Sequence, residues 1–212
     1  TTVERKEISS AVIKRLPRYH RYLGDLMAQG VERISSQELS VRMNVTASQI
    51  RQDLNNFGGF GQQGYGYNIK DLKTEIEGIL GIDHKCKIIL MGAGNLGRAV
   101  ATHMPFDELG FELIGIYDAA PLFTGLKIKD LPIKQMDTLG DFCRLHKPQT
   151  AILCVPDDSA KELVAQLYKL GVHSFWNFTH YDILTDFPDA LVENVHLSDS
   201  LMTLSYQIKC NF

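Results

Sequence analysis

A glycine-rich turn near the middle of the chain has the spacing of a phosphate-binding loop. The apolar run 87–91 ends in a G-x-G-x-x-G pattern made by Gly92, Ala93, Gly94, Asn95, Leu96 and Gly97. In such a turn the first glycine permits a tight bend, the second lets a pyrophosphate approach the backbone, and the third lets helix and strand pack closely. Free N–H groups at the start of the following helix favour a negatively charged ligand. The pattern therefore predicts a dinucleotide-binding loop made by all six residues.

Asp118 supplies the second chemical group of this site. It ends the apolar run 111–117 and lies 21 residues beyond Gly97. A carboxylate in this position accepts hydrogen bonds from the ribose hydroxyls of an adenine dinucleotide and repels a 2′-phosphate. No basic residue follows it directly, since residues 119–121 are Ala-Ala-Pro. We therefore expect NADH or NAD+ as the cofactor, the alternative being a tight turn in a sheet without a ligand.

The elements that would position this loop alternate between strand and helix. Apolar strands are expected at 111–117, 150–156, 173–178 and 192–197, with an amphipathic helix at 157–171. Parallel strands joined by helices form a doubly wound sheet, so we predict an α/β fold with a Rossmann domain over residues 83–198. Val155 and Pro156 end a strand near the expected topological switch point, where the backbone borders the cofactor.

The first part of the chain has the pattern of three helices, the last two separated by a short turn. The run Arg15-Leu16-Pro17 is expected to start the first helix, because proline suits the first helical turn. Ser35 with Glu38, and Thr46 with Gln49, have the spacing of capping boxes at the next two helices. This is helix-turn-helix organisation. The alternative is a plain three-helix bundle with a solvated polar face.

The third helix and the stretch after it could contact DNA. If Ile50 and Leu54 face the core, the polar side chains between them face solvent, where arginine can pair with guanine and glutamine or asparagine with adenine. Residues 57–68 alternate aromatics with glycines, which predicts a hairpin around 62–64 that acts as a wing. We predict a winged-helix DNA-binding domain over residues 1–82. Its candidate contacts are Lys14, Arg15, Arg18, Ser48, Gln49, Arg51, Gln52, Asn55, Gln63, Gly64 and Tyr65.

The composition is that of a globular protein without a membrane anchor. Hydrophobic residues make up 44% of the 212 residues, charged residues 22%, and the net charge is −3. No apolar run reaches the roughly 18 residues of a membrane-spanning helix, and the N-terminal residues lack the apolar core of a signal peptide. The four cysteines have no metal-ligand spacing. We expect a cytoplasmic protein with no metal site.

The sequence favours a sensor of the dinucleotide over an enzyme. No motif assigns His103, His180 or His196 to catalysis, and residues 199–212 leave room for one helix rather than a substrate domain. That helix carries an apolar set that could pack on its own sheet or on a second protomer. A dimer would suit a two-fold operator. The alternatives are a small NAD-dependent oxidoreductase with an N-terminal oligomerisation bundle, and a constitutive DNA-binding protein whose cofactor is only structural.

Taken together, these motifs resemble the Rex family of redox-sensing transcriptional repressors over essentially the whole chain. The resemblance is carried by the runs RLPRYHRYL (15–23), ISSQEL (34–39), IRQDLNNFGGFGQQGYGY (50–67), GAGNLG (92–97) and CVPDDSA (154–160), by Asp118, and by Asn177 and Phe178. It implies a homodimer of winged-helix and Rossmann domains on a palindromic operator in double-stranded DNA. It also implies that the helix 199–212 is swapped between protomers, that Asn177 and Phe178 border the cofactor, and that NADH releases the repressor from DNA.

Four positions depart from the pattern of that family. His103 stands in the helix after the glycine loop where a tyrosine is frequent, and His196 follows Asn-Val where an aspartate is frequent. Gln62 and Gln63 stand at the wing where a basic residue is common. Coupling of the cofactor to DNA binding through those charged groups is therefore not expected to carry over unchanged.

Overall fold

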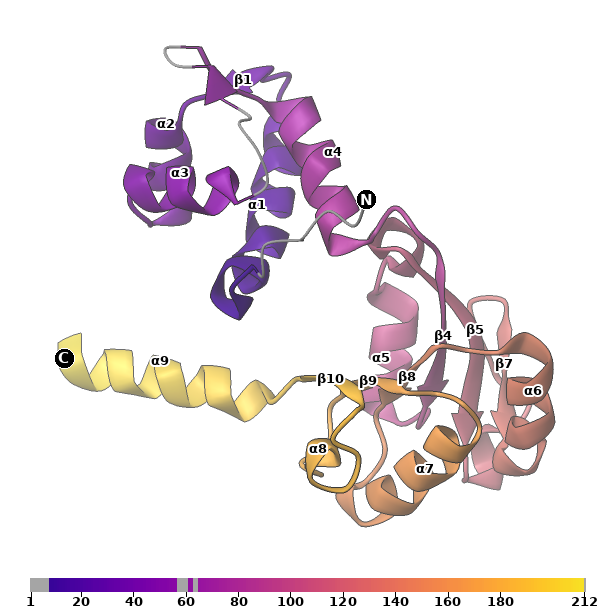
Figure 1. Ribbon diagram of the computed structural model, residues 1–212. Coiled ribbons are helices and arrows are strands. Elements are labelled where there is room, and N and C mark those ends of the chain that lie inside the picture. The colour runs from indigo at the N-terminus through magenta and orange to yellow at the C-terminus, as the bar shows by residue number, and fades with distance from the viewer. Residues whose placement is uncertain (1–7, 57–60, 63–64, 212) are drawn as a thin grey trace. The chain divides into compact units, whose positions relative to one another are not determined.

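The computed structural model describes residues 8–56, 61–62 and 65–211, which divide into two units, Thr1–Asp83 and His84–Phe212. In its described residues, the N-terminal unit combines four helices with a small sheet (Figure 1). Its three strands lie in the antiparallel order β1-β3-β2. Its elements are α1 (Ser10–Ala28), β1 (Arg33–Ile34), α2 (Ser36–Met43), α3 (Ala47–Asn55), β2 (Gly61–Gln62), β3 (Gly66–Asn68) and α4 (Ile69–Leu80). This is a winged-helix arrangement, with β2 and β3 as the hairpin that the glycine-rich run predicted.

The first helix starts earlier than the sequence suggested. We expected Pro17 in the first turn, but α1 begins at Ser10 and Pro17 lies inside the helix, so the predicted helix start was wrong. A proline in a helix interior removes one backbone hydrogen bond. Here α1 presents a continuous buried stripe, and its packing in the core outweighs that loss. The stripe consists of Val12, Leu16, Tyr19, Leu23 and Leu26.

The two following helices begin where the capping residues predicted. Ser35 and Glu38 form a complete capping box at α2. At α3 the Thr46 hydroxyl accepts the backbone N–H of Gln49, but the Gln49 side chain turns to Asp53 instead of back to the cap. Only half of the second predicted box is therefore present. Strand β1 was not foreseen, because two residues carry no readable alternation.

The C-terminal unit is built on a seven-stranded sheet of order β10-β9-β8-β4-β5-β7-β6, parallel except for β6. Its strands are β4 (Cys86–Met91), β5 (Phe111–Asp118), β6 (Lys127–Ile128), β7 (Leu131–Gln135), β8 (Thr150–Leu153), β9 (Ser174–Asn177) and β10 (Leu191–Asn194). Its α-helices are α5 (Asn95–His103), α6 (Leu139–His146), α7 (Asp157–Lys169), α8 (Ile183–Asp186) and α9 (Leu197–Asn211). The predicted doubly wound sheet is confirmed, while β6, β7, α6 and α8 were missed.

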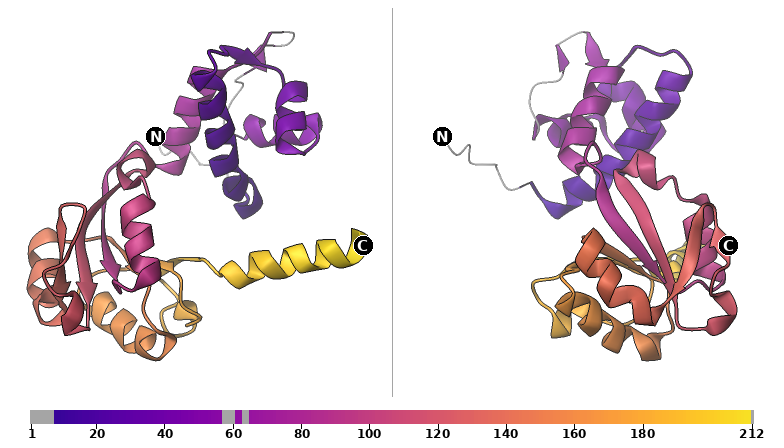
Figure 2. Two further views of the ribbon diagram at one scale, coloured as in Figure 1. Left: turned by 180° about the vertical axis from the view of Figure 1, so that it is seen from behind. Right: turned by 90° about the vertical axis from the view of Figure 1, so that its right-hand side faces the viewer.

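Alternation along the central strand divides the core of this unit between the two faces of the sheet. Ile89 and Met91 of β4 belong to the cluster that includes residues of α6, α7 and α8. Ile88 and Leu90 belong to the other cluster, which includes residues of α5. Figure 2 shows these layers from behind and from the side. The chain turns to opposite sides of β4 after β7, so β4 and β8 form the topological switch point.

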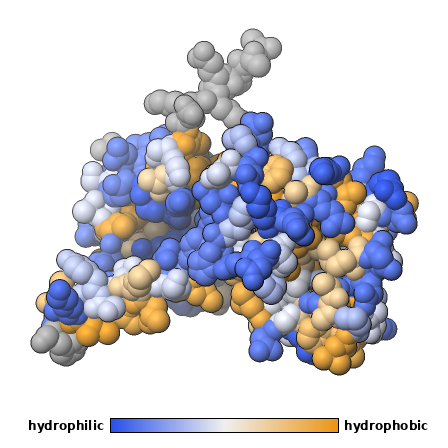
Figure 3. Space-filling view, turned by 90° about the horizontal axis from the view of Figure 1, so that it is seen from below, coloured by the Kyte–Doolittle hydropathy of each residue, from blue (hydrophilic) through white to orange (hydrophobic). Residues whose placement is uncertain are grey.

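The last helix, α9, has no buried residue. Its apolar side chains at helical spacing include Leu197, Leu201, Leu204 and Ile208, which are 67%, 68%, 48% and 51% exposed. The view from below shows hydrophobic residues along this helix (Figure 3). Among the described residues, no helix is long and apolar enough to cross a membrane.

Candidate ligand pocket and nucleic-acid interface

The glycine loop connects β4 to α5 at the carboxyl edge of the sheet. Gly92 has φ +94°, and a Cβ there would lie 2.4 Å from the carbonyl oxygen of Cys154. A Cβ on Gly97 would lie 1.8 Å from the carbonyl oxygen of Gly92. A Cβ on Gly94, by contrast, meets nothing within 4 Å. The first and third glycines are therefore required by the protein itself, whereas the second leaves open space at the start of α5.

Asp118 is held in place by the loop that it faces. Its Oδ2 accepts the backbone N–H of Ala93 at 2.6 Å, and its Oδ1 accepts that of Ala120 at 2.7 Å. Each carboxylate oxygen has two lone pairs, so each can accept one further hydrogen bond. The carboxylate is thus oriented before any ligand arrives. This geometry suits a diol such as a ribose.

A cavity of about 620 Å³ opens over the loop and Asp118. The ends of β5 and β8 and one side of α7 form its walls. Seven of the predicted cofactor residues line it: Gly92, Gly94, Asn95, Leu96, Asp118, Val155 and Pro156. Ala93 and Gly97 support the loop from beneath, Ala93 through its bond to Asp118 and Gly97 through its contact with Gly92. The sequence did not identify the part of the lining that comes from Tyr117, Met136 and α7.

Asn177 does not offer its side chain to a ligand. Its Nδ2 donates to the carbonyl of Tyr181 at 3.1 Å and to Asn194 Oδ1 at 2.8 Å. Its Oδ1 accepts the backbone N–H of Thr179 at 3.1 Å and the Thr179 hydroxyl at 2.7 Å. Both donors and both acceptor positions of the amide are thereby used. We correct the assignment accordingly: Asn177 holds the turns after β9 and β10 together. Phe178 packs edge-on against Trp176 and does not line the cavity.

Cys154 lines the cavity, and two histidines stack on each other in the turns after β9 and β10. Burial raises the pKa of the Cys154 thiol to about 12, so this cysteine stays protonated and is a poor nucleophile. His180 and His196 stack on each other with ring centroids 5.4 Å apart. The His180 backbone N–H donates to Asp157, which begins α7. Within the described part of the chain, no group of three or more His, Cys, Asp and Glu side chains is placed to hold a metal ion.

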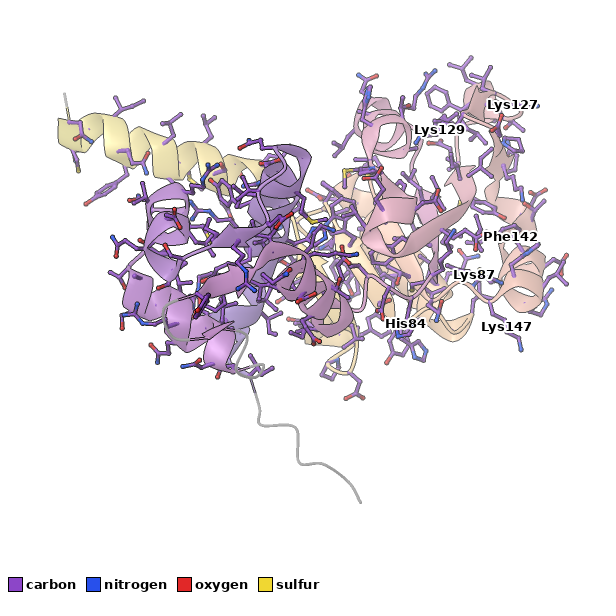
Figure 4. The ribbon with its side chains drawn as sticks, turned by 90° about the horizontal axis from the view of Figure 1, so that it is seen from above. His84, Lys87, Lys127, Lys129, Phe142 and Lys147 are labelled. Atoms are coloured by element: carbon purple, nitrogen blue, oxygen red, sulfur yellow. The ribbon has the colours of Figure 1, made fainter. Side chains whose placement is uncertain are left out.

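At the opposite, amino edge of the sheet, a lysine side chain contacts α6. Figure 4 labels Lys87 of β4, with Phe142 and Lys147 at α6 on the same side of this unit. The Lys87 ammonium donates to the carbonyl of His146 at 3.2 Å. Lys134, which lies towards the carboxyl end of β7 instead, is 4.0 Å from the centroid of the Phe142 ring. These cations anchor α6, and none of the four side chains lines the cavity.

The third helix of the N-terminal unit presents the polar face that its periodicity predicted. Ile50 and Leu54 are buried, whereas Ser48, Arg51, Gln52 and Asn55 are exposed. The Arg51 guanidinium donates to the Ser36 hydroxyl at 3.0 Å, which fixes it beside the start of α2.

Other candidate contacts are spread over α1 and the hairpin. Lys14 is exposed, and Arg18 is half-buried with its guanidinium 5.7 Å from the Tyr22 ring centroid. Tyr65 beside the hairpin is 71% exposed. Gln63 and Gly64 lie outside the described residues.

Asp53 binds two of the residues that were predicted to contact DNA, Arg15 and Gln49. This fully buried carboxylate accepts two hydrogen bonds of 2.7 Å from Arg15, one of 2.8 Å from Gln49 and one of 3.0 Å from Tyr19. Burial would raise the pKa of Asp53, but the hydrogen bonds from Arg15, Gln49 and Tyr19 outweigh it and lower the pKa below its usual value. Arg15 and Gln49 therefore lock α3 against α1, and a direct contact of either residue with DNA stays a prediction.

Two family models match the chain, one on each unit. The model described as "Putative DNA-binding protein N-terminus" covers residues 7–55. The model described as "CoA binding domain" covers residues 83–181.

Curated relatives match nearly the full length. The redox-sensing transcriptional repressor Rex of Thermoanaerobacter pseudethanolicus is 50% identical over 205 residues, which cover 97% of this chain and 91% of that protein. The protein of the same name from Clostridioides difficile is 51% identical over 204 residues, covering 96% of this chain and 97% of the relative.

Solved structures match equally well. A crystal structure of RSP in complex with beta-NADH has a TM-score of 0.87 at 48% identity, and the match covers 96% of this chain and 95% of the RSP chain. A structure of RSP in complex with beta-NAD+ and operator DNA has a TM-score of 0.87 at 50% identity, covering 98% and 94%.

Proposed function

The chain belongs to the Rex family of redox-sensing transcriptional repressors, and from this premise we propose that it binds operator DNA and leaves it when NADH binds the C-terminal unit. Its relatives are repressors, so it is a regulator and not an enzyme. The observation that carries the proposal is the presence, in one chain, of an exposed polar helix in a winged-helix unit and an open glycine loop beside an oriented Asp118.

In this proposal, backbone N–H groups bind the pyrophosphate of the dinucleotide, and a carboxylate binds its adenosine ribose. The N–H groups at Gly94 and Asn95 bind the pyrophosphate, and Asp118 accepts the adenosine ribose hydroxyls. Coenzyme A shares the adenosine diphosphate part but carries a phosphate on that ribose. The Asp118 carboxylate would repel it, as it would the 2′-phosphate of NADPH. This charge favours NADH and NAD+ over both.

Sensing requires that the two cofactor forms bind the DNA-bound and released conformations differently. NADH and NAD+ share every phosphate and ribose contact and differ in the nicotinamide ring, which is cationic only when oxidised. An apolar surrounding of that ring would penalise the cation. The expected result is that NADH releases operator DNA at lower concentration than NAD+ does.

DNA is recognised through α3 in this proposal. Arg51, Gln52 and Asn55 share the exposed face of this helix and can reach base edges, while Lys14 and Arg18 supply phosphate contacts. Arg51→Ala should weaken operator binding by about 1–3 kcal/mol and leave cofactor binding unchanged. Arg144→Ala, an equivalent change in α6 of the other unit, is the matched control and should leave DNA binding unchanged.

We further propose that the operator is palindromic and that the protein binds it as a homodimer through α9. That helix exposes its apolar side chains, and the C-terminal unit carries an apolar groove of about 690 Å³ whose lining includes Met104, Phe106, Phe111 and Trp176. A helix placed in the groove of a second copy would bury both surfaces, whereas packing on its own sheet is the alternative. Leu201→Glu should therefore lower the mass measured by light scattering to that of a monomer.

One experiment separates this function from its alternatives. Operator binding is measured by gel shift at a stated salt concentration, without cofactor and with NADH or NAD+. The repressor requires release that differs between the two cofactors. A constitutive DNA-binding protein predicts no change with either, and an oxidoreductase predicts turnover without operator binding. A repressor acts where the chromosome lies, so we place the protein in the cytoplasm.

A further inference from the structure

One side of α7 faces the cavity with a polar stripe. Ser159, Glu162, Leu163 and Gln166 line it at spacings of three and four residues, which places them on one face of the helix. The neighbouring face carries Ala160, Val164 and Leu167, which are buried in the core. Packing of that apolar face therefore fixes which side chains α7 turns towards a ligand.

Glu162 and Gln166 are available to a ligand. Both are exposed at the rim of the cavity. Across the described ranges, neither side chain has a hydrogen-bond or ion-pair partner in the protein. They are one helical turn apart, so a carboxylate acceptor and an amide with both donor and acceptor lie side by side.

The position of this pair relative to Asp118 indicates which part of a dinucleotide it would meet. With the pyrophosphate over Gly94 and the ribose at Asp118, the base extends into the rest of the cavity. There Met136 and Leu163 supply apolar walls for a flat ring. Polar atoms at the edge of such a ring would point to the rim.

We propose that Glu162 and Gln166 select adenine as the base of the dinucleotide, an inference that rests on the proposed binding of NADH. The Glu162 carboxylate accepts a hydrogen bond from the exocyclic amine of adenine. The Gln166 amide pairs with the adjacent ring edge, which offers an acceptor. Hypoxanthine presents a carbonyl oxygen in place of the amine and an N–H in place of the ring acceptor. A carboxylate facing that oxygen loses its hydrogen bond and repels the ring.

The test compares NADH with reduced nicotinamide hypoxanthine dinucleotide, which differs only in the base and has the same fluorescent nicotinamide. Titration of the wild-type protein should give a dissociation constant about 10-fold higher for the hypoxanthine analogue. In Glu162→Gln the new amide can donate to the carbonyl oxygen, so the ratio should fall to about 2-fold or less. Glu112→Gln, which changes an exposed residue at the amino end of β5, is the matched control and should keep the wild-type ratio.

The outcomes are distinct. Equal binding of the two dinucleotides by wild type would overturn the assignment, while leaving NADH binding intact. Equal weakening of both by Glu162→Gln would also overturn it, because the side chain would then not read the base. If neither dinucleotide binds wild type, the proposed NADH site itself fails and the inference with it. Because Glu162 is exposed, Glu162→Gln should have the melting temperature of the wild-type protein, and a thermal scan measures this.

Discussion

The substitution Gly94→Ala tests whether cofactor binding requires a glycine at this position when folding does not. Gly94 has φ −67° and ψ −171°, an extended conformation that alanine adopts without strain. A Cβ there meets no atom within 4 Å. The variant should therefore fold as well as wild type, with a stability change within about 1 kcal/mol.

The same methyl group lies where a pyrophosphate must approach. A phosphate oxygen that packs against the bare Cα of Gly94 while it accepts a loop N–H would meet this methyl carbon, which requires a contact distance of roughly 3.5 Å. The oxygen must retreat, and one charge-assisted hydrogen bond of about 1.5–3 kcal/mol is lost. The dissociation constant for NADH should rise about 10- to 150-fold.

Two titrations test this, one of NADH by fluorescence and one of operator DNA by gel shift. Gly94→Ala should bind DNA as wild type does but resist release by NADH. Gly78→Ala in α4, where a Cβ also meets nothing within 4 Å, is the matched control and should change neither titration. Wild-type NADH affinity in Gly94→Ala, with an unchanged melting curve, would show that the cofactor does not lie over this loop.

Three further outcomes follow from the packing. Gly97→Ala should lower the melting temperature strongly, because its Cβ would lie 1.8 Å from the Gly92 carbonyl oxygen; an unchanged melt would contradict the loop geometry. Asp53→Asn should lower the free energy of unfolding of the N-terminal unit by about 3 kcal/mol, which a urea titration would measure. This is at the low end for a broken buried ion pair, because the Arg15 side chain is 30% exposed. Since the folded pKa of Asp53 lies below its unfolded value of about 3.9, the pair stabilises fully above that pH and is lost as pH falls through the folded pKa. As pH falls, Asp53→Asn should therefore lose less stability than the wild-type protein does. Identical acid unfolding curves would refute the assignment of Asp53 to this ion pair.

The glycine loop, Asp118 and the polar face of α3 could be predicted from the sequence because each depends on local spacing. Gly92 and Gly97 are five residues apart, and their roles follow from one turn. The roles of Arg15 and Asn177 could not be predicted in this way. Arg15 and Asp53 are 38 positions apart, and only tertiary packing brings the buried carboxylate to the guanidinium. A charged side chain in the sequence does not say whether its partner is DNA or protein.

The elements that were missed lack a readable period. Strand β6 has two residues and α8 has four, too few for alternation or helical periodicity to appear. The cavity-facing side of α7 was also missed, although its signal was present. Once Ala160, Val164 and Leu167 are assigned to the core, Glu162 and Gln166 necessarily lie on another side of the helix. The sequence could not show which of the remaining sides of α7 faces the cavity.

Pairing of two copies through α9, as proposed above, would link repression to the abundance of the protein. A helix that buries nothing in a single copy adds little to that copy's own stability, so its apolar stripe is available for the association that we propose. Where copies pair through it, the dimer concentration rises with the square of the monomer concentration under dilute conditions. Operator occupancy would then decline more steeply than protein level when synthesis slows. Gene dosage, in addition to redox state, would set the threshold at which target promoters open.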